Sequence, residues 1–162
     1  VYGVRKYIAN AKTAEAKNSL GQIGKDAVTA FEGERMSSQV LLENTTTDTI
    51  RQMCQTSTNQ KSVPTNATDI AGKKYQSRKV DWSNGEDVKA NVGWPCLKFE
   101  MTAPQYYQYT YAATGTNTGS FSADAVGDLN GDATYSTFTI LGAIENGRLK
   151  LAPSIGEVSP EE

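Results

Sequence analysis

The chain has 162 residues, a length that suits a single domain. Its 16 lysine and arginine residues against 18 aspartate and glutamate residues give a net charge of -2, which offers no electrostatic case for binding nucleic acid or an anionic membrane. It contains no histidine, which excludes Ser-His and Cys-His nucleophile pairs, histidine-ligated zinc and the commonest general acid–base group.

Residues 1–32 predict one long helix. There is no proline from Val1 to Phe31, and apolar residues recur at steps of three and four, which places them on one helix face. In the second half of the helix this set is Ala16, Leu20, Ile23, Ala27 and Ala30/Phe31. We expect this second half to pack against the rest of the domain.

The beginning of this helix has a different character. Val1, Tyr2, Val4, Tyr7 and Ile8 are mostly apolar, and no capping residue precedes the helical pattern. An apolar tip of this kind is not expected to face water without a partner. The pattern is typical of a sequence that starts within a longer helix. We therefore expect a further apolar helical segment before Val1.

Residues 33–74 are predicted to be a connecting loop region. Met36–Leu42 has the composition of a short helical or extended piece, and Thr49–Cys54 could form a helical turn with Met53 facing inward. Residues 55–74 are rich in Thr, Ser and Asn and contain helix-breaking residues, which is typical of a loop.

The two cysteines, Cys54 and Cys96, are far apart in the chain and form no CxxC pair, which excludes a zinc knuckle and a thioredoxin-type motif. They could form one disulfide or remain as two buried thiols in a reducing compartment. The polar composition around Cys54 resembles that of an exported protein, which favours the disulfide. Closing a loop of this length stabilises a fold by about 4 kcal/mol on the chain-entropy model.

Residues 75–152 predict an antiparallel sheet of about four strands, and residues 153–162 a tail. The period changes to alternation of apolar and polar residues, which is the pattern of half-buried strands. Two Asn-Gly pairs, Asn130-Gly131 and Asn146-Gly147, are strong hairpin signals. A long helix followed by such a sheet is an α+β fold. The expected strands are Leu97–Met101, Tyr106–Ala113, Phe121–Val126 and Tyr135–Ile144, with an added edge strand at Leu149 and Leu151.

A row of tyrosines follows one face of a predicted strand. Tyr107, Tyr109 and Tyr111 alternate along the chain and therefore point to the same side of the sheet. They could form an exposed aromatic binding platform, or they could be large core residues with hydroxyls at the edge of the core. The second interpretation is the more common one and is favoured here.

One loop carries a metal-like pattern, in which oxygen-bearing side chains alternate as they do at the start of an EF-hand. The sixth position is Ala133 where that pattern needs glycine, and the twelfth is Thr139 where it needs an acid. An Asn-Gly hairpin turn explains the same residues without a metal. The candidate calcium ligands are Asp128, Asn130 and Asp132, with Asp124 as an additional candidate. No other cofactor is expected.

Two segments resemble a known family. Residues 1–32, VYGVRKYIANAKTAEAKNSLGQIGKDAVTAFE, are similar to the second part of the N-terminal helix of type IV pilins and their type II secretion pseudopilin relatives. Residues 121–157, FSADAVGDLNGDATYSTFTILGAIENGRLKLAPSIGE, resemble the C-terminal region of minor pilins and pilin-like proteins of Gram-negative bacteria. Together they cover under half of the chain. The prepilin cleavage site that defines the family would lie before Val1.

The resemblance implies a helix packed on an antiparallel sheet and a function carried by surfaces instead of an active site. It implies other pilin subunits as partners and a membrane contact through the segment before Val1. It also implies a location in the inner membrane before assembly and in an extracellular filament afterwards. The residues implied to pack between subunits are Val1, Val4, Tyr7, Ile8 and Ala11. Those implied to make charge contacts between subunits are Arg5, Lys6, Lys12 and Glu15, with Lys17 beside them.

The expected function is therefore that of a structural subunit of a type IV pilus or related filament serving adhesion, motility, DNA uptake or secretion. The alternative is a soluble secreted or periplasmic domain that binds a ligand on its tyrosine-rich sheet. An enzyme is not expected. Its carboxylate pair would have to come from Asp124, Asp128 and Asp132, which share one hairpin and do not face each other across a cleft.

Overall fold

The computed structural model describes residues 2–33, 35–36, 49–50, 52–58, 61–115, 118–152 and 154–158, with residues 2–10 described as helical backbone only. The elements in chain order are α1 (Tyr2–Glu32), β1 (Arg35–Met36), β2 (Thr49–Ile50), β3 (Ser62–Val63), the 3-10 helix η1 (Ala67–Ile70), α2 (Lys79–Trp82), α3 (Gly85–Ala90), α4 (Gly93–Leu97), β4 (Gln108–Thr114), β5 (Ser120–Gly127), β6 (Ser136–Glu145), β7 (Arg148–Leu151) and β8 (Gly156–Val158).

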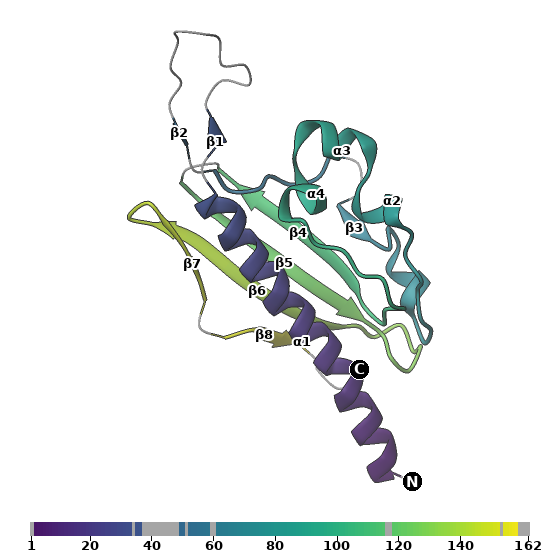
Figure 1. Cartoon of the computed structure of the whole chain (residues 1–162). Helices are drawn as coiled ribbons and strands as arrows, with labels where there is room; N and C mark the ends of the chain where they lie inside the picture. Colours follow the sequence, from purple (N-terminus) through teal and green to yellow (C-terminus); the bar gives the residue numbers. More distant parts are fainter. Residues whose placement is uncertain are drawn as a thin grey trace, which may run out of the picture.

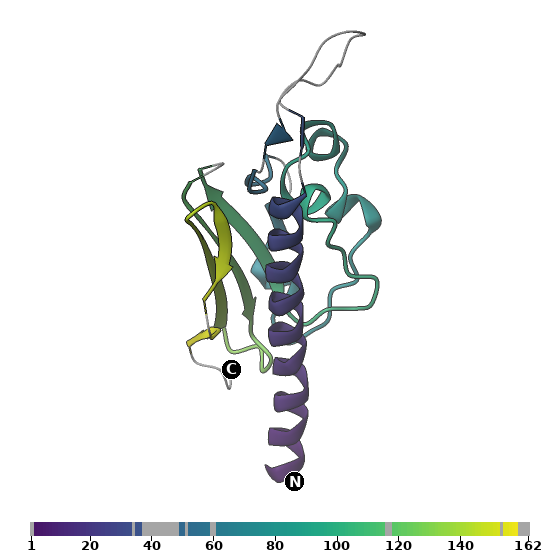
Figure 2. The ribbon, with the colours of Figure 1, turned by 60° about the vertical axis from the view of Figure 1, so that its left-hand side comes forward.

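Helix α1 is the single long helix that the sequence predicts, with 31 residues. It crosses one face of the sheet, and its N-terminal part extends past the end of the sheet (Figures 1 and 2). It packs mainly on β5, β6, β7 and α4. The predicted packing face is confirmed: Ala16, Leu20, Ile23, Ala27 and Phe31 are all at most 2% exposed. The second half of α1 is thus part of the core.

The main sheet has six antiparallel strands in the order β3-β4-β5-β6-β7, and β8 pairs with β6. Strand β6 is long enough to pair along one edge with both β7 and β8. The α+β architecture is confirmed, but the predicted strand number was too low. Strand β3 lies in the region predicted as a loop and β8 in the predicted tail. Neither could be recognised, because two or three residues carry no alternation and β8 is exposed throughout.

The predicted strand at Leu97–Met101 is wrong. This segment begins at Leu97, the last residue of α4, and Lys98 caps that helix in a left-handed conformation with φ 60. Leu97 and Phe99 are both buried, so their spacing resembles that of a strand although the chain between them turns. Helices α2, α3 and α4 therefore replace the first part of the sheet that was predicted for residues 75–152.

The predicted helical turn at Thr49–Cys54 is also wrong. Thr49 and Ile50 form β2, which pairs with β1 in a two-stranded antiparallel ribbon. The prediction that Met53 faces inward is confirmed, since its side chain is 1% exposed. Of the predicted piece Met36–Leu42, only Met36 lies within the described residues, as the last residue of β1.

The disulfide between Cys54 and Cys96 is confirmed. It joins the segment 52–58 to α4, beside an aromatic cluster in which the ring of Trp82 lies 4.9 Å from that of Trp94. The same segment is held by Asp87 of α3, whose carboxylate accepts hydrogen bonds from the Ser57 hydroxyl and the Thr58 amide. These contacts attach the small helical region to the sheet.

Only one of the two Asn-Gly pairs forms a two-residue hairpin turn. Asn146 and Gly147 both have positive φ, 51 and 76, as a type I′ turn between β6 and β7 requires. In the pair Asn130-Gly131 only Gly131 has a positive φ, and the next residue with a positive φ is Ala133, at 70. The hairpin signalled by Asn130-Gly131 forms, since β5 pairs with β6 on either side of it, but the expected two-residue turn is wrong and a longer loop joins the two strands.

Two glycines of α1 make a matched test of how closely the helix approaches the sheet. Gly21→Ala should raise the free energy of unfolding by about 1 kcal/mol, because alanine favours the helix and its Cβ would have no contact within 4 Å. At Gly24 a Cβ would lie 3.0 Å from Ile140 Cδ1 and 3.2 Å from Leu151 Cδ1, so crowding should cancel that gain. Urea unfolding of both variants measures the difference, and equal stabilisation would contradict a tight contact at Gly24.

Candidate functional site

The candidate assembly surface predicted from the sequence begins on the projecting part of α1. Of the five residues expected to pack between subunits, Val1 lies outside the described residues. Val4, Tyr7 and Ile8 belong to the described helical backbone, and their side chains lie outside the description, as do those of Arg5 and Lys6. Ala11 is exposed. The structure therefore places these positions before the buried stretch that starts at Ala16.

Glu15 makes contacts within its own chain. It is half-buried, and its Oε2 accepts hydrogen bonds from the Tyr106 amide at 3.2 Å and from the Tyr109 hydroxyl at 2.9 Å. Burial raises the pKa of Glu15, and the hydrogen bonds from Tyr109 and Tyr106 partly oppose that rise. Glu15 therefore attaches α1 to the start of β4, a role that its position in a charged helical stretch did not suggest.

The two lysines that flank Glu15 also contact their own head. The Lys12 ammonium lies 4.6 Å from the centre of the Tyr106 ring, a cation–π distance. The Lys17 ammonium pairs with Glu157 of β8 at 2.7 Å. Lys12, Glu15 and Lys17 thus all have partners inside the chain, and any contact that they make between subunits would share these groups.

A pair of variants tests the role of Glu15. Glu15→Ala should lower the free energy of unfolding by about 1–3 kcal/mol, because the buried Tyr109 hydroxyl loses its acceptor. Glu15→Gln keeps an acceptor oxygen and should cost less. A carboxyl with a raised folded-state pKa favours folding most when it is protonated, so the wild type should lose stability relative to Glu15→Gln as the pH rises from about 4 to 7. Urea midpoints across this range provide the measurement, and parallel curves would contradict a raised pKa.

The tyrosine row belongs to the core. Tyr107, Tyr109 and Tyr111 are at most 1% exposed beneath α1 and its neighbours, so the core interpretation is confirmed. The Tyr111 hydroxyl donates to the Cys54 carbonyl at 2.6 Å, and burial raises the pKa of Tyr107 to about 12. An exposed tyrosine platform, which the alternative function needs, is therefore not formed by these three residues.

The candidate calcium loop is organised by one buried carboxylate. Asp128 is 0% exposed; its Oδ1 accepts from the amides of Gly131 and Asp132, and its Oδ2 accepts from Ala133 at 2.8 Å. Asn130 and Asp132 are exposed, and their side-chain oxygens accept backbone amides two residues further on. These oxygens are directed at amides of their own loop, as in consecutive Asx turns.

The additional candidate ligand, Asp124, lies apart from that loop. It is four residues before Asp128 on β5, about 13 Å along an extended strand. Its carboxylate accepts the Thr139 hydroxyl at 2.7 Å across the sheet. Among the described residues no group of three His, Cys, Asp or Glu side chains is placed to hold a metal ion. The arrangement of the predicted ligands does not fit a calcium site.

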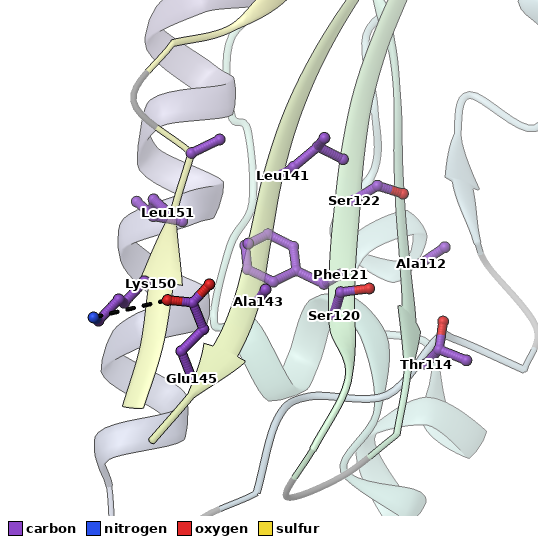
Figure 3. Close-up of a pocket in the computed structure, with 12 residues that line it drawn as sticks. Ala112, Thr114, Ser120, Phe121, Ser122, Leu141, Ala143, Glu145, Lys150 and Leu151 are labelled. Atoms are coloured by element: carbon purple, nitrogen blue, oxygen red, sulfur yellow. Dashed lines mark ion pairs between the residues drawn. The ribbon is translucent and has the colours of Figure 1, made fainter. Parts of the chain in front are cut away.

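A shallow hollow of about 540 Å³ lies on the sheet, over strands β4 to β7. Figure 3 shows small side chains from three strands forming its floor, among them Ala112, Ser122 and Ala143, with Leu141 at its side. The Glu145–Lys150 ion pair, 3.8 Å long, closes one end. Sequence analysis did not find this surface, because its small residues look like ordinary strand positions. The polar side chains that line it are those of Thr114, Ser120, Ser122, Glu145 and Lys150.

Comparison with known proteins identifies no relative. No protein-family model, curated protein or solved structure matches this chain.

Proposed function

We propose that this protein is a structural subunit of a type IV pilus or a related filament, in which subunits pack through the projecting part of α1. The observation that carries the proposal is the division of this one helix. Its buried face begins at Ala16 and continues to Phe31, whereas the part before it extends past the sheet (Figure 2). Helices in proteins gain most of their stability from tertiary packing, and short isolated helices are marginal in water, so a projecting helix is best explained by a partner.

The attached half of the helix suits such a role. Leu20, Ile23 and Ala27 bury one face against the sheet, and Glu15 joins the helix to Tyr106 and Tyr109 at the point where it leaves. These contacts hold the head in one orientation on the helix. A subunit that assembles by its helix needs such a fixed orientation, since every copy must present its head in the same way.

The proposed partners are further pilin subunits and, before assembly, a membrane. None of the described helices has the length and apolarity needed to cross a bilayer. The proposal assigns the membrane contact to residues that precede Val1, as the resemblance to pilins implies. The packing residues proposed for the projecting part are Val1, Val4, Tyr7, Ile8 and Ala11.

Expression of the full natural gene product in a host with a filament assembly system tests the proposal. A photo-crosslinking amino acid at Ala11, which is exposed on α1, should join subunits to one another in sheared filaments. The matched control is the same amino acid at Val88 on α3, which is 53% exposed and far along the chain from the proposed contact. A gene product that is released after cleavage of an ordinary signal peptide, and gives no Ala11 crosslink, would refute the proposal.

A further inference from the structure

A hollow of about 440 Å³ lies between α1 and α4, beside the disulfide. Asp26, Thr29 and Ala30 recur at helical spacing and form its wall on α1. Cys96 of α4 and Lys98, which follows that helix, belong to the opposite wall. Thr29 and Lys98 are exposed, so solvent reaches the hollow at its rim. We call this hollow the Cys96 groove.

The two cysteines of the disulfide differ in their access to the Cys96 groove. Cys96 lines it, whereas Cys54 does not and is only 1% exposed. The chain around Cys54 is fixed to the sheet, because the Tyr111 hydroxyl donates to the Cys54 carbonyl at 2.6 Å and the Thr56 hydroxyl accepts the Ala113 amide at 2.9 Å. A small reagent that approaches the folded chain from solvent therefore meets Cys96 and not Cys54.

The burial of Cys54 determines how cleavage of the disulfide would proceed. When an external thiolate attacks the Cys96 sulfur, the bond to Cys54 breaks, and Cys54 leaves as a thiolate in the core, where apolar surroundings disfavour it. The released Cys54 stays beside the mixed disulfide on Cys96 and can attack that sulfur again. Cleavage in the folded chain is therefore readily reversed, because the neighbouring thiol is held at high effective concentration.

The same geometry favours formation of the bond. The Cys96 thiolate attacks one sulfur of an external disulfide, which forms a mixed disulfide on Cys96 and releases one thiolate. Cys54 then loses its proton, attacks the Cys96 sulfur and displaces the second thiolate. Two electrons and two protons pass from the cysteine pair to the external disulfide, which leaves as two thiols. Cys96 is thus the residue that carries the intermediate in both directions.

We propose that the Cys96 groove is a thiol-exchange site, through which the disulfide closes and exchanges in the folded chain by way of a mixed disulfide on Cys96. The volume of the groove is that of a small-molecule site, which favours a low-molecular-weight disulfide such as oxidised glutathione over the active site of another protein. Asp26 and Lys98 bring opposite charges to its walls, so neither sign of reagent is excluded. Such exchange does not depend on filament assembly, since it needs only the groove and the disulfide.

Single-cysteine variants test this assignment. C54A keeps the thiol of Cys96 and C96A keeps that of Cys54, and the two are matched because both lack the disulfide. With oxidised glutathione and no denaturant, C54A should form its mixed disulfide at least about tenfold faster than C96A, as intact-protein mass spectrometry can measure. In concentrated urea the two rates should be equal, because the unfolded chain protects neither thiol. An oxidised thiol–disulfide oxidoreductase in place of glutathione distinguishes the sources: reaction with C54A would admit a protein partner, and no reaction would restrict the groove to small reagents.

A second measurement uses the disulfide-bonded chain and does not depend on the stability of those variants. T29W should fill the groove and slow reduction of the disulfide by dithiothreitol about tenfold relative to the wild type. The matched control is K25W, which places the same side chain at an exposed position of α1 that does not line the groove and should leave the rate unchanged. Equal rates for C54A and C96A in the absence of urea, faster reaction of C96A, or equal reduction of T29W and K25W would overturn the proposal.

Discussion

Replacing Cys54 and Cys96 together by alanine should lower the free energy of unfolding by about 4 kcal/mol, because the unfolded chain regains the entropy of a loop 42 residues long. Domains of this size have a free energy of unfolding of only about 5–15 kcal/mol, so the variant should be close to the limit of stability. The disulfide joins segment 52–58 to α4, whereas α1 packs mainly on the sheet. We therefore expect hydrogen exchange to accelerate first in residues 52–58 and in α3 and α4.

Urea unfolding of the double variant and of the wild type with and without a reductant measures this effect. The reductant should lower the wild-type midpoint toward that of the variant and leave the variant unchanged, which makes the variant its own control. A midpoint that the reductant does not move in either protein would show that the disulfide contributes little. Uniform acceleration of exchange across α1 and β6 would contradict a local effect.

Replacing Asp128 by alanine should lower the free energy of unfolding by about 3 kcal/mol. The buried carboxylate accepts three backbone amides, and each such bond contributes about 1 kcal/mol net. The backbone of the loop supports a second contact, since the Asp128 carbonyl accepts the Gly72 amide at 2.7 Å. Loss of loop order should therefore extend to the turn after η1.

The control is Asp132→Ala, which removes an exposed side chain that accepts one amide and should cost about 1 kcal/mol or less. Thermal melts of all three proteins with calcium and with a chelator test the predicted metal site at the same time. Because the oxygens of Asp128 already accept amides, we expect no shift of the wild-type midpoint. A midpoint that calcium raises in the wild type, and in neither variant, would establish calcium binding, since a ligand of the native state must stabilise it.

The sequence predicts the long elements of this fold well and the short ones poorly. Helix α1 and strands β4, β5 and β6 each carry enough residues to show a period, and all lie within two residues of their predicted limits. In contrast, α4 has five residues and is followed by a left-handed Lys98, so the buried Leu97 and Phe99 on either side of that cap have the spacing of a strand. Strands β1, β2, β3 and β8 are held by pairing with distant segments, which no local pattern reveals.

The candidate site shows the same limit. The Cys54–Cys96 disulfide was favoured by the composition around Cys54, and the burial of the tyrosine row was favoured because aromatic side chains on one strand face are more often part of the core. The partner of Glu15 could not be found, because Tyr106 and Tyr109 lie more than ninety positions away. The same is true of Lys12, whose ammonium meets the Tyr106 ring only after the chain has folded. Net charge and local spacing are insensitive to groups that tertiary structure brings together.

Gly24 has a mechanical consequence for a helix under load. Its backbone faces Ile140 and Leu151 so closely that a methyl group would be crowded there. Sliding α1 along its axis by four residues, about 6 Å, would bring Leu20 or Val28 to that position. Either side chain is far larger than a methyl group and would clash with Ile140 and Leu151. The sheet therefore prevents the helix from sliding in either direction along its axis. A pulling force on the projecting end would therefore pass to the head with the helix locked in register.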